Sequence, residues 1–282
     1  MKFLILMSSL VLSASAFALP RAPFNALEMK SLKLNLEAPA YNFEGIVKLS
    51  NCSGSLVIFN GMPMTAKGIV MTNGHCIQKP GGFLSPGEVW VNKAISRGMK
   101  IFDSAMGLHP IQATKILYAT MTNTDVAFYE LTQSYAEISK AYNVEPLTLD
   151  TQHPVVAEPI EIISGYWDKG YSCEIDSFIF KMKEADWTWT DSIRYTATCD
   201  TIGGTSGSPI IRKSDRVVIG VNNTSNEDGK VCEMNNPCEV SESGKIAAFK
   251  GVRYGQQTYN VYSCLTPAFK FDLSIENCEL PK

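Results

Sequence analysis

The sequence predicts a fold built mainly from β-strands. Short runs rich in Val, Ile, Thr and Tyr recur along the chain, and turn-forming residues separate them, with 20 Gly and 14 Pro among 282 residues. Aromatic residues make up a further 10% of the chain. This combination favours many short strands joined by tight turns over a bundle of helices.

The composition is that of a soluble globular protein, with 45% hydrophobic and 19% charged residues. The length allows one large domain or two smaller domains that share a cleft. The formal net charge is only −3, so neither a nucleic acid nor an anionic membrane is expected as a partner.

The first residues have the pattern of a secretory signal peptide. Lys2 supplies a positive charge, 3–12 form a short apolar core, and small residues lead to an expected cleavage site after Ala18. A membrane anchor is the alternative, but the apolar core is too short to span a bilayer. We therefore expect 1–18 to be a signal peptide and the mature protein to be secreted or periplasmic. Residues 19–43 are irregular and are expected to be a pro-segment or an N-terminal tail.

Regular structure is expected from Gly45 onward. The β-rich runs that predict strands are 45–49, 55–59, 68–72, 89–91, 115–118, 126–129, 160–163, 177–182, 192–198, 209–211 and 217–221. Between the two halves, 134–142 has helix-compatible residues, and 143–154 is the least β-like stretch. The link between two domains is placed there. Residues 222–242, rich in Asn, Glu and Ser, predict a loop.

The cysteines indicate disulfides. There are 8 cysteines, an even number behind a signal peptide, which is typical of an oxidised exported protein. The chain has no Cys-x-x-Cys pair, no His-Glu-x-x-His and only 3 histidines, so no metal site is expected. Spacing alone leaves the pairing of the cysteines open.

The segment 203–209, Gly-Gly-Thr-Ser-Gly-Ser-Pro, is the first candidate for catalysis. Glycines beside Ser206 allow a sharp turn whose N–H groups point at a substrate oxygen, although a surface turn is the plainer interpretation. Chain order decides between hydrolase types. The last histidine, His153, precedes Ser206, which excludes an α/β-hydrolase. No aspartate precedes Asp103, so His75 does not fit the subtilisin order. The order that remains is His, Asp, Ser.

Four segments then resemble the chymotrypsin and trypsin-like serine proteases. They are the cysteine-bearing strand 51–57, the histidine motif 72–76, the aspartate motif 123–127 and the serine motif 204–209. The Ser-Gly-Ser-Pro form and 163–166 are most similar to the bacterial glutamyl endopeptidase and exfoliative-toxin branch. The resemblance covers about 44–225. Residues beyond about 228 match nothing in detail.

The resemblance implies an all-β fold of two six-stranded antiparallel barrels, with the active site in the cleft between them. The first barrel is expected at 44–145 with His75 and Asp125. The second is expected at 146–282 with Ser206 and a C-terminal extension. Neither barrel is catalytic alone, because the triad is assembled across the cleft.

The resemblance also implies a role for each residue. Ser206 is the expected nucleophile, His75 the general base, and Asp125 the residue that orients His75. The backbone N–H groups of Gly204 and Ser206 are expected to form the oxyanion hole. Two alternatives remain: a structural histidine beside a disulfide, and Asp103 in place of Asp125.

The resemblance implies a first disulfide that braces the histidine loop. This is Cys52–Cys76. A second pair, Cys173–Cys199, follows if the strands on either side of 178–189 form a hairpin. The remaining four cysteines then form two disulfides between residues close in sequence, Cys232–Cys238 and Cys264–Cys278.

Substrate preference and activation are read from the positions before Ser206. In trypsin-like proteases the pocket base lies at the position of Asp200, which favours Arg or Lys. In the glutamyl branch a hydroxyl and a histidine hold a glutamate. Thr201 supplies the hydroxyl, but Asn222 replaces the histidine. We therefore expect a preference for basic residues first, a broad preference second and a preference for acidic residues last.

The position of Thr205 bears on activation. In the trypsin group a freed N-terminus pairs with an aspartate at this position and orders the oxyanion hole. Thr205 carries no charge, so activation by a freed N-terminus is not expected here.

The function expected from the sequence is a secreted serine endopeptidase that works through an acyl-enzyme. It needs no cofactor or metal, acts on protein or peptide substrates, and is a monomer. One alternative is a catalytically silent relative that serves as a binding module. A serine esterase is a second alternative, and the chain order opposes it.

Overall fold

The computed structural model describes residues 41–282, which form one compact unit. The expected signal peptide at 1–18 and the following segment to residue 40 lie outside the described residues. The predicted boundary between the two domains, at 145/146, is not tested and stays a prediction.

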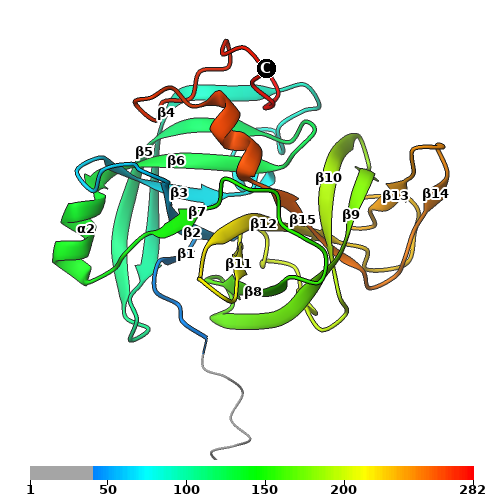
Figure 1. Ribbon diagram of the computed structural model, residues 1–282, viewed down its shortest axis with the longest axis horizontal. Helices are drawn as coiled ribbons and strands as arrows, with labels where there is room; N and C mark the ends of the chain where they lie inside the picture. The colour runs from blue at the N-terminus through cyan, green and yellow to red at the C-terminus, as the bar shows by residue number, and fades with distance from the viewer. Residues whose placement is uncertain (1–40) are drawn as a thin grey trace, which may run out of the picture. The chain divides into compact units, whose positions relative to one another are not determined.

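The first half of this unit forms a closed antiparallel barrel (Figure 1). Its strands are β1 (Ile46–Lys48), β2 (Ser53–Phe59), β3 (Lys67–Thr72), β4 (Val89–Phe102), β5 (Leu108–Thr120) and β6 (Val126–Ser134). The ring runs β1-β2-β3-β6-β5-β4 and closes because β1 pairs with both β2 and β4. Closure leaves no free strand edge in this half.

The second half forms another closed antiparallel barrel. Its strands are β8 (Pro159–Ser164), β9 (Lys169–Glu184), β10 (Trp187–Tyr195), β11 (Pro209–Arg212), β12 (Val218–Ser225) and β15 (Arg253–Gln257). The ring runs β8-β9-β10-β15-β12-β11 and closes between β11 and β8. The prediction of two six-stranded antiparallel barrels is thus confirmed.

Strand β15 was not predicted, because its sequence lacks the apolar alternation of a barrel strand. Its last four residues, including Gln256 and Gln257, are nevertheless buried. The amide of Gln256 donates to Ser192 Oγ over 3.2 Å. A side chain at Gly255 would collide with the Tyr195 hydroxyl. Glycine is therefore required where β15 crosses β10.

The link between the barrels contains helix α2 (Tyr135–Tyr142) and strand β7 (Leu147–Leu149). A capping box between Ser134 and Glu137 begins the helix, and Asn143 ends it in the left-handed conformation at φ 53°. Strand β7 lies within the stretch expected to be least β-like. It pairs in parallel with β2 of the first barrel and β12 of the second, so it joins the two barrels (Figure 1).

The residues after β15 return to the first barrel. They begin with the 3-10 helix η2 (Tyr259–Cys264). Phe271 stacks on Tyr118 with ring centroids 5.5 Å apart and also contacts Phe128 and Phe59. The Tyr118 hydroxyl donates to the Pro281 carbonyl. The expected C-terminal extension of the second barrel therefore packs into a hydrophobic cluster that strands of both barrels share.

Four disulfides occur in the described residues, and none of their cysteines is free. The pairs are those expected from the sequence: Cys52–Cys76, Cys173–Cys199, Cys232–Cys238 and Cys264–Cys278. The condition for the second pair is met, because β9 and β10 form a hairpin. Such a set fits an extracellular protein.

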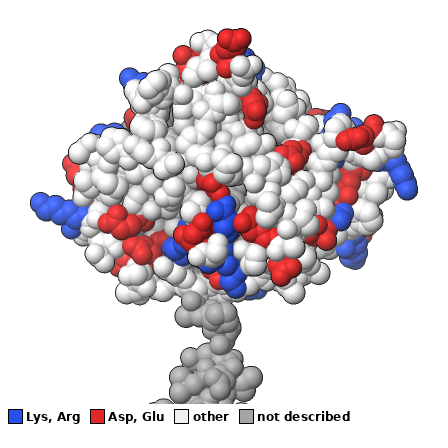
Figure 2. Space-filling model, viewed as in Figure 1, with Lys and Arg blue, Asp and Glu red and all other residues white. Residues whose placement is uncertain are grey.

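The stretch 222–242, expected to be a loop, also holds the end of β12 and strand β13 (Cys238–Val240), which pairs with β9 and with β14 (Ile246–Ala247). Acidic and basic side chains are mixed on the face that Figure 2 shows. No helix within 41–282 is long and apolar enough to cross a membrane.

Candidate active site

His75 lies on a short turn that the first barrel holds rigidly. Strand β3 ends at Thr72, and the 3-10 helix η1 (Gly74–Cys76) follows. The disulfide from Cys76 to Cys52 ties this turn to the start of β2. A side chain at Gly74 would collide with the Thr120 carbonyl, so only glycine lets the turn approach β5 this closely.

Asp125 is fully buried directly before β6, and both of its carboxylate oxygens face His75. Oδ2 lies 2.7 Å from Nδ1 of the imidazole, and Oδ1 accepts the backbone N–H of His75 over 3.0 Å. This arrangement places the proton of a neutral imidazole on Nδ1 and leaves Nε2 as the free ring nitrogen.

The environment of His75 changes its pKa. Burial lowers this pKa, but the negative charge of Asp125 and its hydrogen bond raise it, and Glu184 adds to the increase. The attractive effects win, so the pKa of His75 lies above its ordinary value of 6.5. His75 therefore becomes neutral, and able to take a proton, at a higher pH than an unperturbed histidine.

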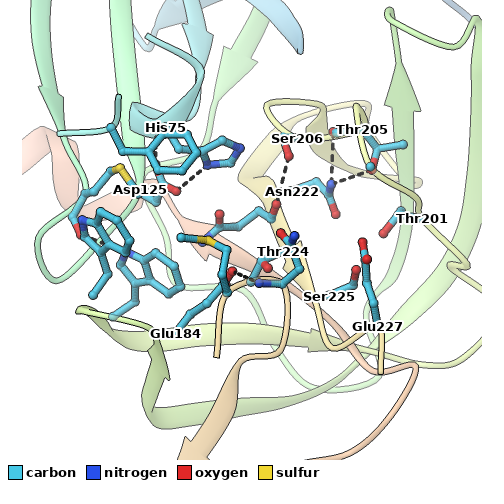
Figure 3. Close-up of a pocket in the computed structure, with 18 of the residues that line it drawn as sticks. His75, Asp125, Glu184, Thr201, Thr205, Ser206, Asn222, Thr224, Ser225 and Glu227 are labelled. Carbon is cyan, nitrogen blue, oxygen red and sulfur yellow. Dashed lines mark hydrogen bonds and ion pairs between the residues drawn. The ribbon is translucent and has the colours of Figure 1, made fainter. Parts of the chain in front are cut away.

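Ser206 lies opposite this pair, on the loop that leads into β11 (Figure 3). His75, Asp125 and Ser206 all line one cleft. The Ser206 hydroxyl donates to the Asn223 carbonyl over 3.2 Å. Within 41–282 it makes no hydrogen bond to His75, so the expected contact between nucleophile and base is not formed in this structure.

The loop before Ser206 contains the two residues predicted to form an oxyanion hole, Gly204 and Ser206 itself. Gly204 has φ +90°, a conformation that disfavours any residue with a side chain. The N–H groups of Gly204 and Ser206 have no hydrogen-bond acceptor among the described residues. Both donors are therefore free to bind an oxygen of a substrate.

The buried side chains of Thr205 and Asn222 stabilise this loop through hydrogen bonds. The buried Thr205 hydroxyl donates to the Ile202 carbonyl over 2.6 Å. The Asn222 amide donates to the carbonyl and the hydroxyl of Thr205 (Figure 3). Asn222 was expected to bind substrate; although it lines the cleft, its NH₂ group is committed to the loop.

The assignment of Asp200 to the base of the specificity pocket stays a prediction, and its surroundings do not favour it. The side chain of Asp200 is 73% exposed and forms an ion pair with Arg253 of β15. Asp200 is not among the residues that line the cleft, whereas Thr201 is. An exposed carboxylate that already has a cationic partner offers little to a substrate in the cleft.

The opposite wall of the cleft was not predicted from the sequence. It is formed by Phe83 and by Trp187 and Trp189 of β10. The ring centroid of Phe83 lies 6.1 Å from that of His75 and 5.8 Å from that of Trp187. The indoles donate to the carbonyls of Leu84 and Met121. The β9–β10 hairpin of the second barrel thereby forms a wall beside the base.

Two acidic residues, Glu184 and Glu227, also line the cleft, and no Lys or Arg does so. Glu184 is buried, and its carboxylate accepts the Asn235 N–H over 2.8 Å. Burial raises the pKa of Glu184, while hydrogen bonds from Thr224 and Asn235 and the charge of His75 partly oppose the increase. These acidic groups were not found from the sequence, because they come from a hairpin and a loop without a motif.

Within the described part of the chain, one cluster has the composition of a metal site: Cys52, His75 and Cys76. The two cysteines form a disulfide and therefore offer no thiolate to a metal. The cluster does not suit a metal ion. The expectation of a protein without metal or cofactor stays a prediction.

Comparison with protein families gives a match to the trypsin-like peptidase domain over residues 52–221. No curated protein matches the sequence. Among solved structures, the MamO protease domain from Magnetospirillum magneticum is similar, with 12% identity, 79% of this chain and 97% of that chain covered, and a TM-score of 0.49.

Two further structures are similar. One is a Glu endopeptidase, with 16% identity, 78% of this chain and 86% of that chain covered, and a TM-score of 0.44. The other is kallikrein-related peptidase 10, with 12% identity, 80% of this chain and 96% of that chain covered, and a TM-score of 0.48.

Proposed function

Because the chain belongs to the trypsin-like peptidase family, we propose that it is an active serine endopeptidase that is secreted and cleaves peptide bonds through an acyl-enzyme. The observation that carries the proposal is the pair formed by His75 and the buried Asp125, with 2.7 Å between Nδ1 and Oδ2, on the same cleft as Ser206. An oriented base beside a serine is what activation of a hydroxyl requires.

In the proposed reaction the Ser206 hydroxyl leaves the Asn223 carbonyl and turns toward His75. Nε2 of His75 takes the proton as Oγ attacks the carbonyl carbon of the substrate. Asp125 stabilises the imidazolium that forms, and the N–H groups of Gly204 and Ser206 bind the oxyanion. His75 returns the proton to the leaving amine, and water then hydrolyses the acyl-enzyme by the same steps.

One observation favours a different function, that of a silent binding module. The Ser206 hydroxyl donates to Asn223 rather than to His75. If this bond persisted with substrate present, Ser206 would not be activated. The three triad residues and Gly204 are nevertheless all present, and rotation about one side-chain bond of Ser206 is enough to break the bond with Asn223.

Labelling with a fluorophosphonate separates these two functions. We expect the mature protein to react at one residue, Ser206, because the phosphorus centre needs an activated hydroxyl and an oxyanion hole. Mass spectrometry of the digested protein identifies the labelled residue. The heat-denatured protein is the control and should not react. A folded protein that remains unlabelled would favour the binding module.

A second expected result concerns substrate side chains. Since Glu184 and Glu227 line the cleft without a compensating Lys or Arg, we expect cleavage after Glu to be at least about tenfold weaker than after neutral or basic residues, the equivalent of ~1.4 kcal/mol of repulsion. Digestion of a peptide library by the mature protein, followed by mass spectrometry, measures this preference.

Two variants distinguish the source of the preference. Glu227→Gln should weaken discrimination against Glu, because it removes one of the two carboxylates. Asp200→Ser should leave the cleavage profile unchanged, because Asp200 is paired with Arg253 outside the cleft lining. Cleavage predominantly after Glu, or loss of a basic preference in Asp200→Ser, would contradict this assignment.

A further inference from the structure

The loop that carries the oxyanion-hole donors is held by an indole from the second barrel. Trp167 lies between β8 and β9, and 48% of the residue is exposed. Its Nε1–H donates to the carbonyl of Gly203 over 2.7 Å. A half-exposed tryptophan gains less free energy from burial than one in the core. Here the polar edge of the indole makes a specific hydrogen bond with the backbone near Ser206.

This contact fixes the direction of the neighbouring N–H. Gly203 and Gly204 share one peptide plane, and the C=O and N–H of a trans peptide point in opposite directions. Because the carbonyl of Gly203 points at Trp167, the N–H of Gly204 points away from Trp167. Turning the peptide over would break the Trp167 hydrogen bond and hide the N–H.

The fit of Trp167 against the loop is tight. A Cβ atom on Gly204 would lie 2.9 Å from Trp167 Nε1 and 2.9 Å from the ring of Tyr166. These contacts are shorter than ordinary van der Waals separations, so the aromatic pair packs directly on the Gly204 backbone. The two rings meet edge to face, with centroids 4.9 Å apart.

Trp167 is itself anchored to the first barrel. Its backbone N–H donates to Ser164 Oγ over 3.3 Å, and that hydroxyl lies 2.9 Å from Ser53 Oγ of β2. Ser53 accepts the N–H of Tyr166 and donates its own N–H to the carbonyl of Ser206 over 2.8 Å. Ser53 and Ser164 are fully buried. The indole is therefore connected by hydrogen bonds to the segment that it positions.

Thr205, the residue directly before Ser206, carries no charge, and the nearest charged contact to this loop within 41–282, that of Arg253 with Thr201 and Asp200, lies two residues before Gly203. Thr205 has a hydroxyl that is already bonded to Ile202 and Asn222. It has no carboxylate with which a new N-terminal amine could pair. The orientation of the Gly203–Gly204 peptide must then come from uncharged contacts, and the Trp167 bond is the side-chain contact that reaches this peptide within 41–282.

We propose that Trp167 is a positioning residue that holds the Gly203–Gly204 peptide with the Gly204 N–H turned into the oxyanion hole. Trp167 acts on the rate through this N–H and touches no reacting atom. The proposal rests on the proposed function, because it assigns the residue that sets the oxyanion hole of that same site.

The test is Trp167→Phe, which keeps an aromatic ring and removes the Nε1 donor. We expect kcat to fall about 10- to 100-fold, below the 100- to 1000-fold typical of a lost oxyanion donor, because the peptide still samples the active orientation. KM should change less than about threefold. The affinity for a peptide boronate, which places an oxygen in the hole, should fall by the same factor as kcat/KM.

The matched control is Trp90→Phe. Trp90 donates Nε1–H to Glu88 over 2.8 Å on the first barrel and is not part of the cleft lining. The same chemical change there should leave kcat and boronate affinity unaltered. A general loss of stability would act on both variants and would not separate kcat from KM.

Crystal structures of the wild-type protein and Trp167→Phe give a readout that does not depend on activity. The variant should show the Gly203–Gly204 peptide turned over or in two orientations. Unchanged kcat and boronate affinity, or a single unaltered peptide orientation in the variant, overturns the role of Trp167. Failure of the wild-type protein to label or to hydrolyse peptides would instead count against the proposed function.

Discussion

Replacing Ser206 with alanine is expected to lower kcat by about 10⁶-fold. In the proposed reaction Oγ of Ser206 forms the acyl-enzyme, and the variant has no atom that could take its place. Residual hydrolysis of about 10³–10⁴-fold over water should survive, since the oxyanion hole and the binding cleft remain. A fluorogenic peptide chosen from the library digestion measures kcat and KM.

Ser208→Ala is the matched control for this result. Ser208 lies two residues further along the same loop, is buried, and its hydroxyl has no partner among the described residues. The variant should retain both hydrolysis and fluorophosphonate labelling. Equal loss of activity in Ser206→Ala and Ser208→Ala would show that the loop, rather than one nucleophile, had been disturbed.

Replacing Asp125 with asparagine is expected to lower kcat by about 10⁴-fold. The amide that replaces the carboxylate has an NH₂ group that can donate toward Nδ1, which favours the wrong tautomer of His75. It also removes the negative charge that stabilises the imidazolium. The variant should fold, because the shape of the side chain is almost unchanged, and thermal unfolding by circular dichroism checks this.

The same variant gives a pH signature. In the wild-type protein Asp125 holds the pKa of His75 above 6.5, so kcat/KM should rise with pH through a midpoint above that value. Without the charge, burial is left to lower the pKa of His75. In Asp125→Asn the rise of kcat/KM with pH should therefore occur at lower pH than in the wild-type protein, while the maximum value of kcat/KM is lower.

Asp103→Asn tests the rival assignment. Asp103 pairs with His109 in a surface turn, with 2.8 Å between Oδ2 and Nε2. Its replacement should leave kcat and the pH profile as they are. Full activity in Asp125→Asn, or a large loss in Asp103→Asn, would mean that Asp125 had been assigned the wrong role.

The barrels and the region around His75 and Ser206 were predictable because their signals are local. Each strand of the first barrel contains an apolar run, and the segments around His75, Asp125 and Ser206 are short motifs in a fixed order. The Cys52–Cys76 disulfide followed from one of those motifs. Features of this kind need no knowledge of distant contacts.

Features that depend on distant contacts were missed or misjudged. Asp200 has the sequence position of the pocket base. Its carboxylate instead pairs with Arg253, outside the cleft lining. Arg253 belongs to β15, a strand that was not predicted because its buried residues are mostly polar. Trp187 and Trp189 line the same cleft as His75 only because the β9–β10 hairpin contacts the first barrel, where the indoles donate to Leu84 and Met121. The periodicity of apolar residues in the sequence does not predict this contact between the two barrels.

The return of the residues after β15 to the first barrel sets the order in which the protein becomes complete during synthesis. All strands of the first barrel have emerged once residue 134 is out. Yet Phe59, Tyr118 and Phe128 lack their aromatic partner Phe271 until the last part of the chain has been made. The barrel that holds the base is thus finished only after the loop bearing Ser206 has been made.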